Sequence, residues 1–199
     1  MTDEQELGSR KVVGAILAAG SSSRFGSAKQ LAIKDGQTLL ARASETLLAT
    51  AINQAIVVLG CHSALIKESM TAGKNKYPEI VENNDWPEGI ASSIRCATAY
   101  AAGNQASHLL LMVCDQPLVT PELLNQLLAA SYHQPEAIIA CNYADSVGIP
   151  ALFPQSSFAQ LLTLCGDKGA KSIICQGHYV SIDFAGGAVD IDRPADLQD

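Results

Sequence analysis

Short apolar runs alternate with longer amphipathic stretches along most of the chain. Buried strands are predicted from five short apolar runs, at 12–17, 55–59, 77–81, 109–113 and 137–140. Helices are predicted where apolar residues recur at helical spacing, in the stretches 38–50, 63–70, 92–102 and 121–131. This alternation indicates crossover connections, and therefore an α/β fold of three layers, with a mostly parallel sheet covered by helices on both faces.

Polar residues mark where several of these helices begin. Thr38, Ser63 and Thr120 stand at N-cap positions, and Pro121 suits a first helical turn. No internal repeat or low-complexity linker divides the chain, so we expect one domain over residues 11–199. Residues 1–10 are polar and charged, which predicts a disordered tail in place of a signal peptide. No apolar run approaches 18 residues, so we expect no membrane span and a cytoplasmic protein.

The first predicted strand leads into the stretch 17–31, which reads LAAGSSSRFGSAKQL. Gly20 and Gly26 tolerate positive φ, so several backbone N–H groups can turn inward, while Arg24 and Lys29 add positive charge. Ligands of open α/β sheets bind beyond the carboxyl ends of the strands. The stretch therefore predicts a loop that binds a polyphosphate.

Two well-known phosphate-binding motifs do not fit this spacing. In a Walker A loop the second glycine comes five residues after the first, but Gly26 comes six residues after Gly20 and is followed by Ser27. The dinucleotide fingerprint requires glycine where this chain has Ser22. An ordinary surface loop rich in glycine and serine has the same composition and stays open as an alternative.

An acid follows the predicted strand 109–113. A buried carboxylate without a partner costs several kcal/mol, so Asp115 needs a cation at this place. Mg²⁺ prefers one or two carboxylates together with phosphate oxygens and water, which suits an acid beside a polyphosphate loop. The alternative is that Asp115 caps a helix or a turn near Pro117.

Composition limits the partners and the kinds of site. The 199 residues are 48% hydrophobic with a net charge of −7, and no run of Lys or Arg would attract nucleic acid or anionic lipid. The cysteines and histidines show no metal-ligand spacing. We interpret the cysteines as mostly reduced core residues, with disulfides as the alternative, and the histidines as structural or surface residues. These are Cys61, Cys96, Cys114, Cys141, Cys165 and Cys175, and His62, His108, His133 and His178.

The stretch 17–31 resembles the N-terminal signature of the MobA-like nucleotidyltransferases, most closely that of the molybdenum cofactor cytidylyltransferases, which tend to carry Leu-Ala-Ala-Gly. The resemblance runs from about residue 12 to residue 197, with its motifs in family order. It implies a Rossmann-like nucleotidyltransferase fold in which this loop wraps the triphosphate of an NTP. The NTP-binding residues that it implies in the loop are Leu17, Ala18, Ala19, Gly20, Ser22, Arg24 and Lys29.

The same resemblance implies a metal site. Asp115 matches the family's metal ligand in its Asp-x-Pro element, and the segment 189–197, VDIDRPADL, resembles the run that closes many nucleotidyltransferases. Asp192 then completes the site for Mg²⁺. Asp196 is expected in the first turn of a terminal helix, and Asp190 has no assigned role. A solvated acidic tail is the alternative for these three aspartates.

Residues 83–93, NNDWPEGIASS, resemble the element with which the family reads the nucleobase. Gly89 allows close backbone approach, and Ser92 or Ser93 can offer a hydroxyl and N–H groups at the start of a helix. The resemblance therefore adds Gly89 and Ser92 to the NTP-binding residues. Trp86 fits a lid over a ligand and a plain loop anchor equally well.

Two further segments, 148–154 and 166–171, resemble the part of the family that receives the acceptor. The acceptor-binding residues implied are Gly148, Pro150, Gly166, Asp167, Lys168, Gly169 and Lys171. The family more often has Arg where this chain has Lys171, so bidentate phosphate binding is lost there. A glycine-capped helix end at Gly166, followed by a helix from Lys168, is compatible with the same residues.

The reaction implied is Mg²⁺-dependent transfer of CMP from CTP to the phosphate of molybdopterin or its molybdenum form, with release of pyrophosphate. Arg24, Lys29 and Asp115 are the expected catalytic residues, and a molybdoenzyme or chaperone would receive the product. GTP or another phosphorylated acceptor is the alternative within this chemistry. From other classes, an oxidoreductase-type relative or a non-catalytic cofactor-delivery module stays open.

Overall fold

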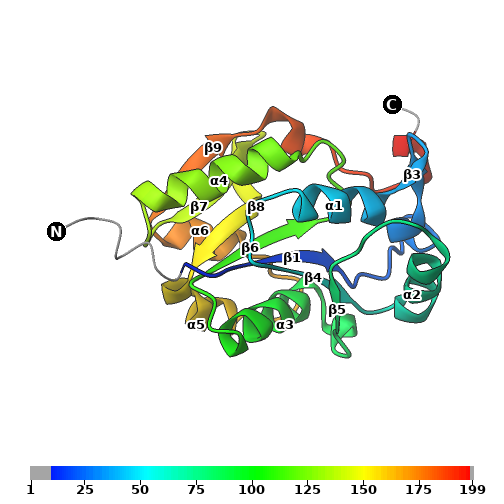
Figure 1. Ribbon diagram of the computed structural model, residues 1–199, viewed down its shortest axis with the longest axis horizontal. Helices are drawn as coiled ribbons and strands as arrows, with labels where there is room; N and C mark the ends of the chain where they lie inside the picture. Colours follow the sequence, from blue (N-terminus) through cyan, green and yellow to red (C-terminus); the bar gives the residue numbers. More distant parts are fainter. Residues whose placement is uncertain (1–9, 198–199) are drawn as a thin grey trace.

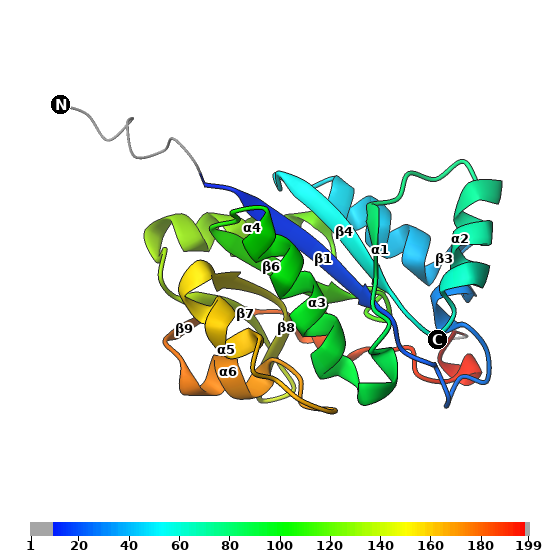
Figure 2. The same cartoon turned by 90° about the horizontal axis from the view of Figure 1, so that it is seen from below.

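The computed structural model describes residues 10–197. A seven-stranded sheet with the order β5-β4-β1-β6-β8-β7-β9 forms its centre (Figures 1 and 2). The strands are β1 (Val12–Ala18), β4 (Gln54–Leu59), β5 (Glu79–Glu82), β6 (His108–Val113), β7 (Ile138–Tyr143), β8 (Ser146–Pro154) and β9 (Tyr179–Asp183). Strand β8 runs antiparallel to both of its neighbours, and the other pairs are parallel. The sheet is thus mostly parallel, as predicted.

Helices cover both faces of this sheet. The helices are α1 (Leu39–Leu48), α2 (Ser63–Ala72), α3 (Ile90–Gly103), α4 (Pro121–His133), α5 (Phe158–Leu161) and α6 (Lys171–Gln176). In Figure 1, α1 and α4 lie on one side of the strands, and α3 and α5 lie on the other. Two separate clusters of buried apolar residues fill the spaces between the sheet and these helix layers. The predicted three-layer α/β architecture is confirmed.

Strand β1 takes part in both apolar clusters because its side chains alternate. Val13, Ala15 and Leu17 pack with α3 on one face, while Val12 and Ile16 belong to the cluster on the opposite face. The strand lies between β4 and β6 with parallel pairing on both sides. A strand that is buried on both faces reads as a continuous apolar run, which is why this sequence predicted it.

The elements predicted from the sequence are all present, with ends that differ by a few residues. The largest difference is at the strand predicted at 137–140, which extends to Tyr143, and the strand predicted at 77–81 spans Glu79–Glu82. Thr38 and Thr120 cap their helices as expected, since their hydroxyls accept hydrogen bonds from Ala41 N at 3.1 Å and Leu123 N at 3.3 Å.

Ser63 does not act as the predicted cap. It is the first residue of α2, and His62 holds the N-cap position without a side-chain hydrogen bond. The Ser63 hydroxyl instead donates to the Glu82 carboxylate at 2.8 Å, at the end of the neighbouring strand β5. A carboxylate is the stronger acceptor, and it draws the hydroxyl away from the helix terminus.

The region after residue 143 contains elements that the sequence analysis did not predict as such. Strand β8 was interpreted only as a binding segment, and β9 was not predicted. No helix begins at Lys168 and no helix ends at Gly166, because α5 ends at Leu161 and α6 begins at Lys171. That alternative for residues 166–171 is therefore wrong, and the segment between the two helices is a loop.

Several composition-based expectations can be compared with the structure. The six cysteines are free, but only Cys114 and Cys141 are buried, and Cys165 and Cys175 are exposed. The core placement is therefore wrong for those two exposed thiols. Among the described residues, no helix combines the length and apolar character needed to cross a bilayer. The tail predicted at 1–10 lies outside the described residues except for Arg10.

Candidate active site

The predicted binding loop and the acid at 115 meet at the carboxyl ends of β1 and β6, two neighbouring strands. The loop leaves β1 after Ala18, and Asp115 follows β6 directly. The C-terminal segment returns to the same place, where Ile191 N donates a hydrogen bond to the Asp115 backbone carbonyl at 2.9 Å. Segments far apart in sequence therefore converge at one end of the sheet.

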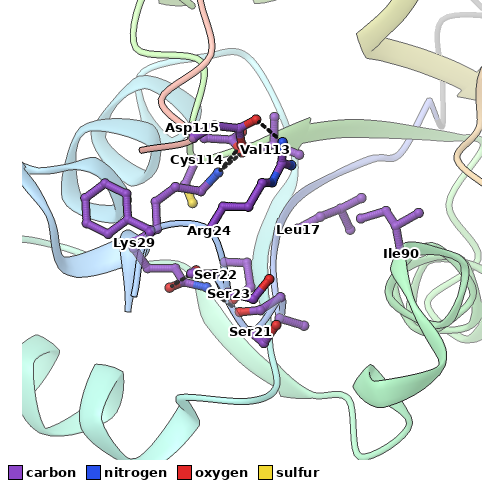
Figure 3. Close-up of a pocket in the computed structure, with 16 residues that line it drawn as sticks. Leu17, Ser21, Ser22, Ser23, Arg24, Lys29, Ile90, Val113, Cys114 and Asp115 are labelled. Atoms are coloured by element: carbon purple, nitrogen blue, oxygen red, sulfur yellow. Dashed lines mark hydrogen bonds and ion pairs between the residues drawn. The ribbon is translucent and has the colours of Figure 1, made fainter. Parts of the chain in front are cut away.

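A pocket of about 290 Å³ lies where these segments meet (Figure 3). We call it the loop pocket. The residues that line it are Leu17, Ala18, Ala19, Gly20, Ser21, Ser22, Ser23, Arg24, Phe25, Lys29, Gln30, Ile90, Val113, Cys114, Asp115 and Asp192. Every residue of the stretch 17–31 that the sequence analysis assigned to NTP binding is in this lining. The β1 loop and charged side chains from three segments of the chain thus share one pocket.

The loop holds its shape through backbone turns and one buried amide. Ser22 and Gly26 both have positive φ, at 54° and 79°, and the Ser22 carbonyl accepts from the N–H groups of Phe25 and Gly26. The Gln30 side chain is 3% exposed and donates to the carbonyls of Ala18 at 2.8 Å and Gly20 at 3.2 Å. Gln30 therefore ties the loop together, a role that the sequence analysis missed.

Four charged side chains face one another in the loop pocket. Lys29 Nζ lies 2.6 Å from Asp115 Oδ2 and 3.2 Å from Asp192 Oδ1. Arg24 Nη1 lies 2.7 Å from Asp192 Oδ2. Burial by itself lowers the pKa of Lys29, but the two carboxylates outweigh burial and the pKa is raised. Lys29 is therefore a firmly charged ammonium group between two acids.

Two further aspartates support this arrangement. The Asp196 carboxylate accepts hydrogen bonds from the backbone N–H groups of Asp192 at 2.9 Å and Arg193 at 2.7 Å, within the short 3₁₀ helix Pro194–Leu197 and its start. It therefore fixes the backbone that carries Asp192. The pKa of Asp190 is raised by burial and by the negative charges of Asp115 and Asp192. Asp190, unassigned in the sequence, therefore senses the charges of both acids, although it does not line the loop pocket.

The donor set suits a divalent cation that is shared with a ligand. Among residues 10–197, no cluster of three or more His, Cys, Asp or Glu side chains has the geometry of a complete metal site. Asp115 and Asp192 nevertheless lie close enough for one cation, Lys29 Nζ, to contact both. Two carboxylates beside a loop rich in glycine and serine form a donor set that a hard divalent cation can complete with ligand oxygens and water.

A second pocket, the Trp86 pocket, adjoins the loop pocket. Its lining consists of Ala19, Gly20, Ser21, Trp86, Pro87, Gly89, Ile90, Ser93 and Asp167. Gly89 is in this lining. Ser92 is absent from it: its hydroxyl donates to the Gly89 carbonyl, whereas Ser93, which is equally buried and also accepts from Asn83, lines the pocket. Ser92 therefore stabilises the start of α3, and Ser93 is the serine that reaches the pocket.

Gly89 packs closely against residues 166–167. Its φ is +120°, and a Cβ atom there would lie 2.4 Å from Asp167 Oδ1 and 2.6 Å from the Gly166 carbonyl oxygen. Glu88 accepts from Gly166 N at 3.0 Å and forms an ion pair with Arg95 at 2.5 Å. These bonds, from Arg95 first and then from Gly166, lower the pKa of Glu88 to about 2. The loop before α3 and the loop before α6 are therefore held together.

A third pocket, the Tyr143 pocket, has a mainly apolar lining. It consists of Leu17, Ile90, Ile94, Leu111, Tyr143, Ser146, Val147, Gly148, Ile149, Gly169, Ala170 and Lys171. Gly148 leaves space for Tyr143, since a Cβ atom on Gly148 would lie 2.5 Å from the tyrosine hydroxyl oxygen. The Tyr143 hydroxyl donates to the Ile149 carbonyl at 2.9 Å. Tyr143 was not anticipated, because nothing in the sequence linked it to the acceptor segments.

The predicted acceptor-binding residues divide among several places. Gly148, Gly169 and Lys171 line the Tyr143 pocket. Asp167 lines the Trp86 pocket, and Gly166 packs against Gly89, which lines the same pocket. The other two do not line the Tyr143 pocket: Pro150 is buried within β8, and Lys168 is exposed. The predicted acceptor-binding residues therefore do not line a single pocket.

Comparison with known proteins agrees with this geometry. Residues 14–180 match the family described as MobA-like NTP transferase domain. A nicotine blue oxidoreductase from Paenarthrobacter nicotinovorans is 33% identical over 176 residues, which cover 83% of this chain and 82% of the relative. A probable molybdenum cofactor guanylyltransferase from Geobacillus sp. is 27% identical over 177 residues, which cover 86% of each protein.

A solved relative has the same fold. The crystal structure of Rv0371c from Mycobacterium tuberculosis H37Rv matches with a TM-score of 0.78 at 30% identity, over 94% of this chain and 96% of that one. A structure of Rv0371c in complex with manganese matches with a TM-score of 0.75 at 27% identity, over 96% and 97% of the two chains. A divalent metal therefore accompanies at least one protein of this fold and similar sequence.

Proposed function

The chain belongs to the MobA-like NTP transferase family, and on that premise we propose that it transfers CMP from CTP to the phosphate of a molybdopterin-type acceptor, using Mg²⁺ and releasing pyrophosphate. One observation carries the proposal. Arg24 and Lys29 from the β1 loop meet Asp115 and Asp192 in the loop pocket, with ion-pair distances between 2.6 and 3.2 Å. The cationic side chains that can bind phosphates and the carboxylates that can bind a divalent metal therefore lie in one pocket, where a single ligand can contact both.

In this proposal the loop pocket holds the triphosphate. Backbone N–H groups of the glycine- and serine-rich loop, together with Arg24 and Lys29, hold the β- and γ-phosphates. Arg24 has a largely exposed side chain, at 69%, and can swing from Asp192 to a phosphate. Such groups stabilise charge that develops in the transition state because they are already in position when the reaction begins.

The acceptor phosphate enters from the Tyr143 pocket. One of its oxygens attacks the α-phosphorus in line, and a new P–O bond forms as the bond from the α-phosphorus to the bridging oxygen breaks. The electron pair leaves with pyrophosphate. A phosphate acceptor is already ionised near neutral pH, so no general base is needed. The residues of this chain bind and orient the triphosphate and the acceptor phosphate, and they do not accept a proton.

Asp115 and Asp192 would hold the Mg²⁺. The ion, when bound, neutralises charge on the α-phosphate and on the departing pyrophosphate. Lys29 lies between the two carboxylates, and we expect it to move to the phosphates when the metal binds, since a divalent cation and an ammonium group repel each other. The Asp196 hydrogen bonds keep Asp192 in place during this exchange.

The choice of CTP rests on the Leu-Ala-Ala-Gly start of the loop and on the groups around the Trp86 pocket. Cytosine needs donors to O2 and N3 and an acceptor for its amino group, which backbone groups near Gly89 and the Ser93 hydroxyl can supply. GTP is the alternative nucleotide, since curated relatives include molybdenum cofactor guanylyltransferases. We further propose that residues 11–199 form one transferase domain and that a molybdoenzyme or a chaperone takes up the product.

Incubation with each of the four NTPs, Mg²⁺ and molybdopterin, with pyrophosphate as the readout, tests the proposal. We expect release with CTP that depends on both the metal and the acceptor. Faster release with GTP would change the nucleotide but keep the chemistry. Absence of release with any NTP and acceptor would reject a nucleotidyltransferase.

An oxidoreductase is the second candidate, because a nicotine blue oxidoreductase shares 33% identity over most of this chain. This candidate predicts oxidation of NADH or NADPH in the presence of an organic dye acceptor, or copurification with a coloured cofactor. Absorbance spectra of the purified protein and an assay of nicotinamide oxidation would separate the two functions.

A further inference from the structure

One side chain lines all three pockets. Ile90 is the first residue of α3, and it takes part in the lining of the loop pocket, the Trp86 pocket and the Tyr143 pocket. It is partly buried and packs against the apolar cluster beneath the sheet. Leu17, at the end of β1, lines two of the three. In Figure 3 the Leu17 and Ile90 side chains face each other at one side of the loop pocket.

The reaction also has one atom that is common to three groups. In nucleotidyl transfer, the α-phosphorus is joined to the nucleoside and to pyrophosphate, and it becomes joined to the acceptor. If these groups occupy the Trp86, loop and Tyr143 pockets respectively, the α-phosphorus must lie where the three pockets meet. This reasoning rests on the proposed function. Given that function, the linings of the three pockets lead to Ile90.

We propose that Ile90 shields the α-phosphorus from water and thereby makes the acceptor phosphate the nucleophile. An aliphatic side chain offers no hydrogen bond to a water molecule, and Ile90 and Leu17 both line the loop pocket and the Tyr143 pocket, where the acceptor phosphate would enter. Water competes for the same phosphorus, since its oxygen can attack in line, release pyrophosphate and leave CMP and a proton. Exclusion of water from a reactive centre prevents such side reactions.

The chain supplies a matched control for this test. Ile33, in β2 (Ile33–Lys34), is 63% exposed and lines none of the three pockets. The Ile33→Ala variant therefore deletes the same atoms without touching the site. Ile90→Val is the conservative variant at the site itself, since it removes one methylene group and keeps a branched apolar surface.

The experiment measures CMP formed from CTP and Mg²⁺ without acceptor, and transfer to molybdopterin with acceptor, in the full-length protein. We expect Ile90→Ala to raise the ratio of hydrolysis to transfer by about tenfold or more. Ile90→Val should lie between wild type and alanine, and Ile33→Ala should keep the wild-type ratio. CTP affinity, from a calorimetric titration, should change little in any variant, because the phosphate-binding cations remain.

The outcomes separate this inference from the function on which it rests. Wild-type transfer combined with an unchanged hydrolysis ratio in both Ile90 variants would overturn the shielding role and leave the transferase intact. A wild-type protein that neither transfers nor hydrolyses any of the four NTPs would overturn both. If Ile90→Ala does not fold, Ile90→Val decides the matter, since an unchanged ratio there is the contrary result.

Discussion

At the scale of single residues, the charge balance of the loop pocket depends on Lys29. Its side chain is 13% exposed and contacts two carboxylates, so its removal leaves two acids close together with less positive charge. Arg24 forms an ion pair with Asp192 from a much more exposed position. Exposed ion pairs contribute little, and partly buried ones contribute more because water screens them less.

We expect Lys29→Met to weaken CTP binding by about 10- to 100-fold, as the loss of a charged hydrogen bond to phosphate would. Calorimetric titration with CTP and Mg²⁺ measures the effect. Lys74→Met removes an exposed lysine beyond α2 and serves as the control. Equal affinities of the Lys29→Met variant and the wild type would contradict the role of Lys29 in phosphate binding.

Asp115 is expected to matter for the reaction more than for the fold. We expect Asp115→Asn, which keeps the shape and removes the charge, to lower pyrophosphate release by about 10²- to 10³-fold. Asp35→Asn, in the turn between β2 and β3 (Gln37–Thr38), makes the same change at a 70% exposed side chain and should have no such effect. Circular dichroism should show folded protein for both. Undiminished turnover in Asp115→Asn would remove this acid from the metal site.

His108 makes the stability of the folded protein depend on pH, independently of the loop pocket. Burial first, and then the positive charge of Arg10, lower its pKa from 6.5 to about 4. Because the folded state disfavours the protonated ring, His108 contributes full stability above about pH 6.5 and loses it as the pH falls toward 4. The contribution is at most about 3 kcal/mol.

The matching experiment is denaturant unfolding of wild type and His108→Gln at several pH values. We expect the difference in the free energy of unfolding between the two proteins to shrink as the pH falls from 6.5 to 4. The comparison between the two proteins cancels the titration of carboxylates such as Glu88. A difference that stays constant over this range would mean that His108 is not held neutral by the fold.

At the scale of elements, the junction between the loop before α3 and residues 166–167 lies beside two pockets, the Trp86 pocket and the Tyr143 pocket. Gly89 is the tightest point, with its positive φ and the close approach of Gly166 and Asp167. The ion pair between Glu88 and Arg95 and the hydrogen bond from Gly166 N reinforce it. A change here should therefore disturb the Trp86 pocket and the neighbouring Tyr143 pocket together.

We expect Gly89→Ala to destabilise the protein by about 1–3 kcal/mol, because the new Cβ would be strained in φ and would collide with residues 166–167. The Michaelis constants for CTP and for the acceptor should both rise. Gly103→Ala, at the other end of α3, is the control, since among the described residues no atom outside the neighbouring backbone lies within 4 Å of a Cβ there. It should be neutral or slightly stabilising in thermal unfolding. A Gly89→Ala variant as stable as Gly103→Ala would contradict the tight packing.

The elements also show how far the sequence could lead. Apolar runs such as Leu109 to Val113 predicted their strands because burial on both faces leaves no polar position. Strand β8 escaped this logic, since its first four residues are only partly buried and it contains glycine and proline. The β1 loop was predictable because its glycines, its serines and its cations are close together in sequence, whereas Asp192 came only from the family resemblance. Ile90, Tyr143 and Gln30 were not predictable, because apolar or amide side chains reveal a site only through their neighbours in space.

At the scale of the whole molecule, the loop pocket joins the beginning of the chain to its end. The β1 loop, Asp115 after β6 and the segment with Asp192 meet there, and the Ile191 hydrogen bond to Asp115 links the last two. A ligand that contacts all three should therefore stabilise the entire fold and not one part of it. Binding to the folded state alone raises stability by mass action.

We expect CTP and Mg²⁺ together, at about 100 times the dissociation constant, to raise the melting temperature by roughly 5–10 °C. Either ligand alone should raise it less, because metal and phosphates complete each other's coordination. Scanning calorimetry checks this and should show a single transition if residues 11–199 act as one domain. Separate transitions, of which only one responds to the ligands, would contradict that proposal.

The double burial of β1 also limits how this protein can evolve. Val13, Ala15 and Leu17 fill one apolar cluster while Val12, Ile16 and Ala18 fill the other. One residue inserted within Val12–Ala18 would exchange the two sets and shift the start of the loop by one position. Homologous genes should accordingly accept substitutions in this strand but no insertions or deletions. Changes of length should instead gather in outlying turns such as the one at Asp35 and Gly36 between β2 and β3.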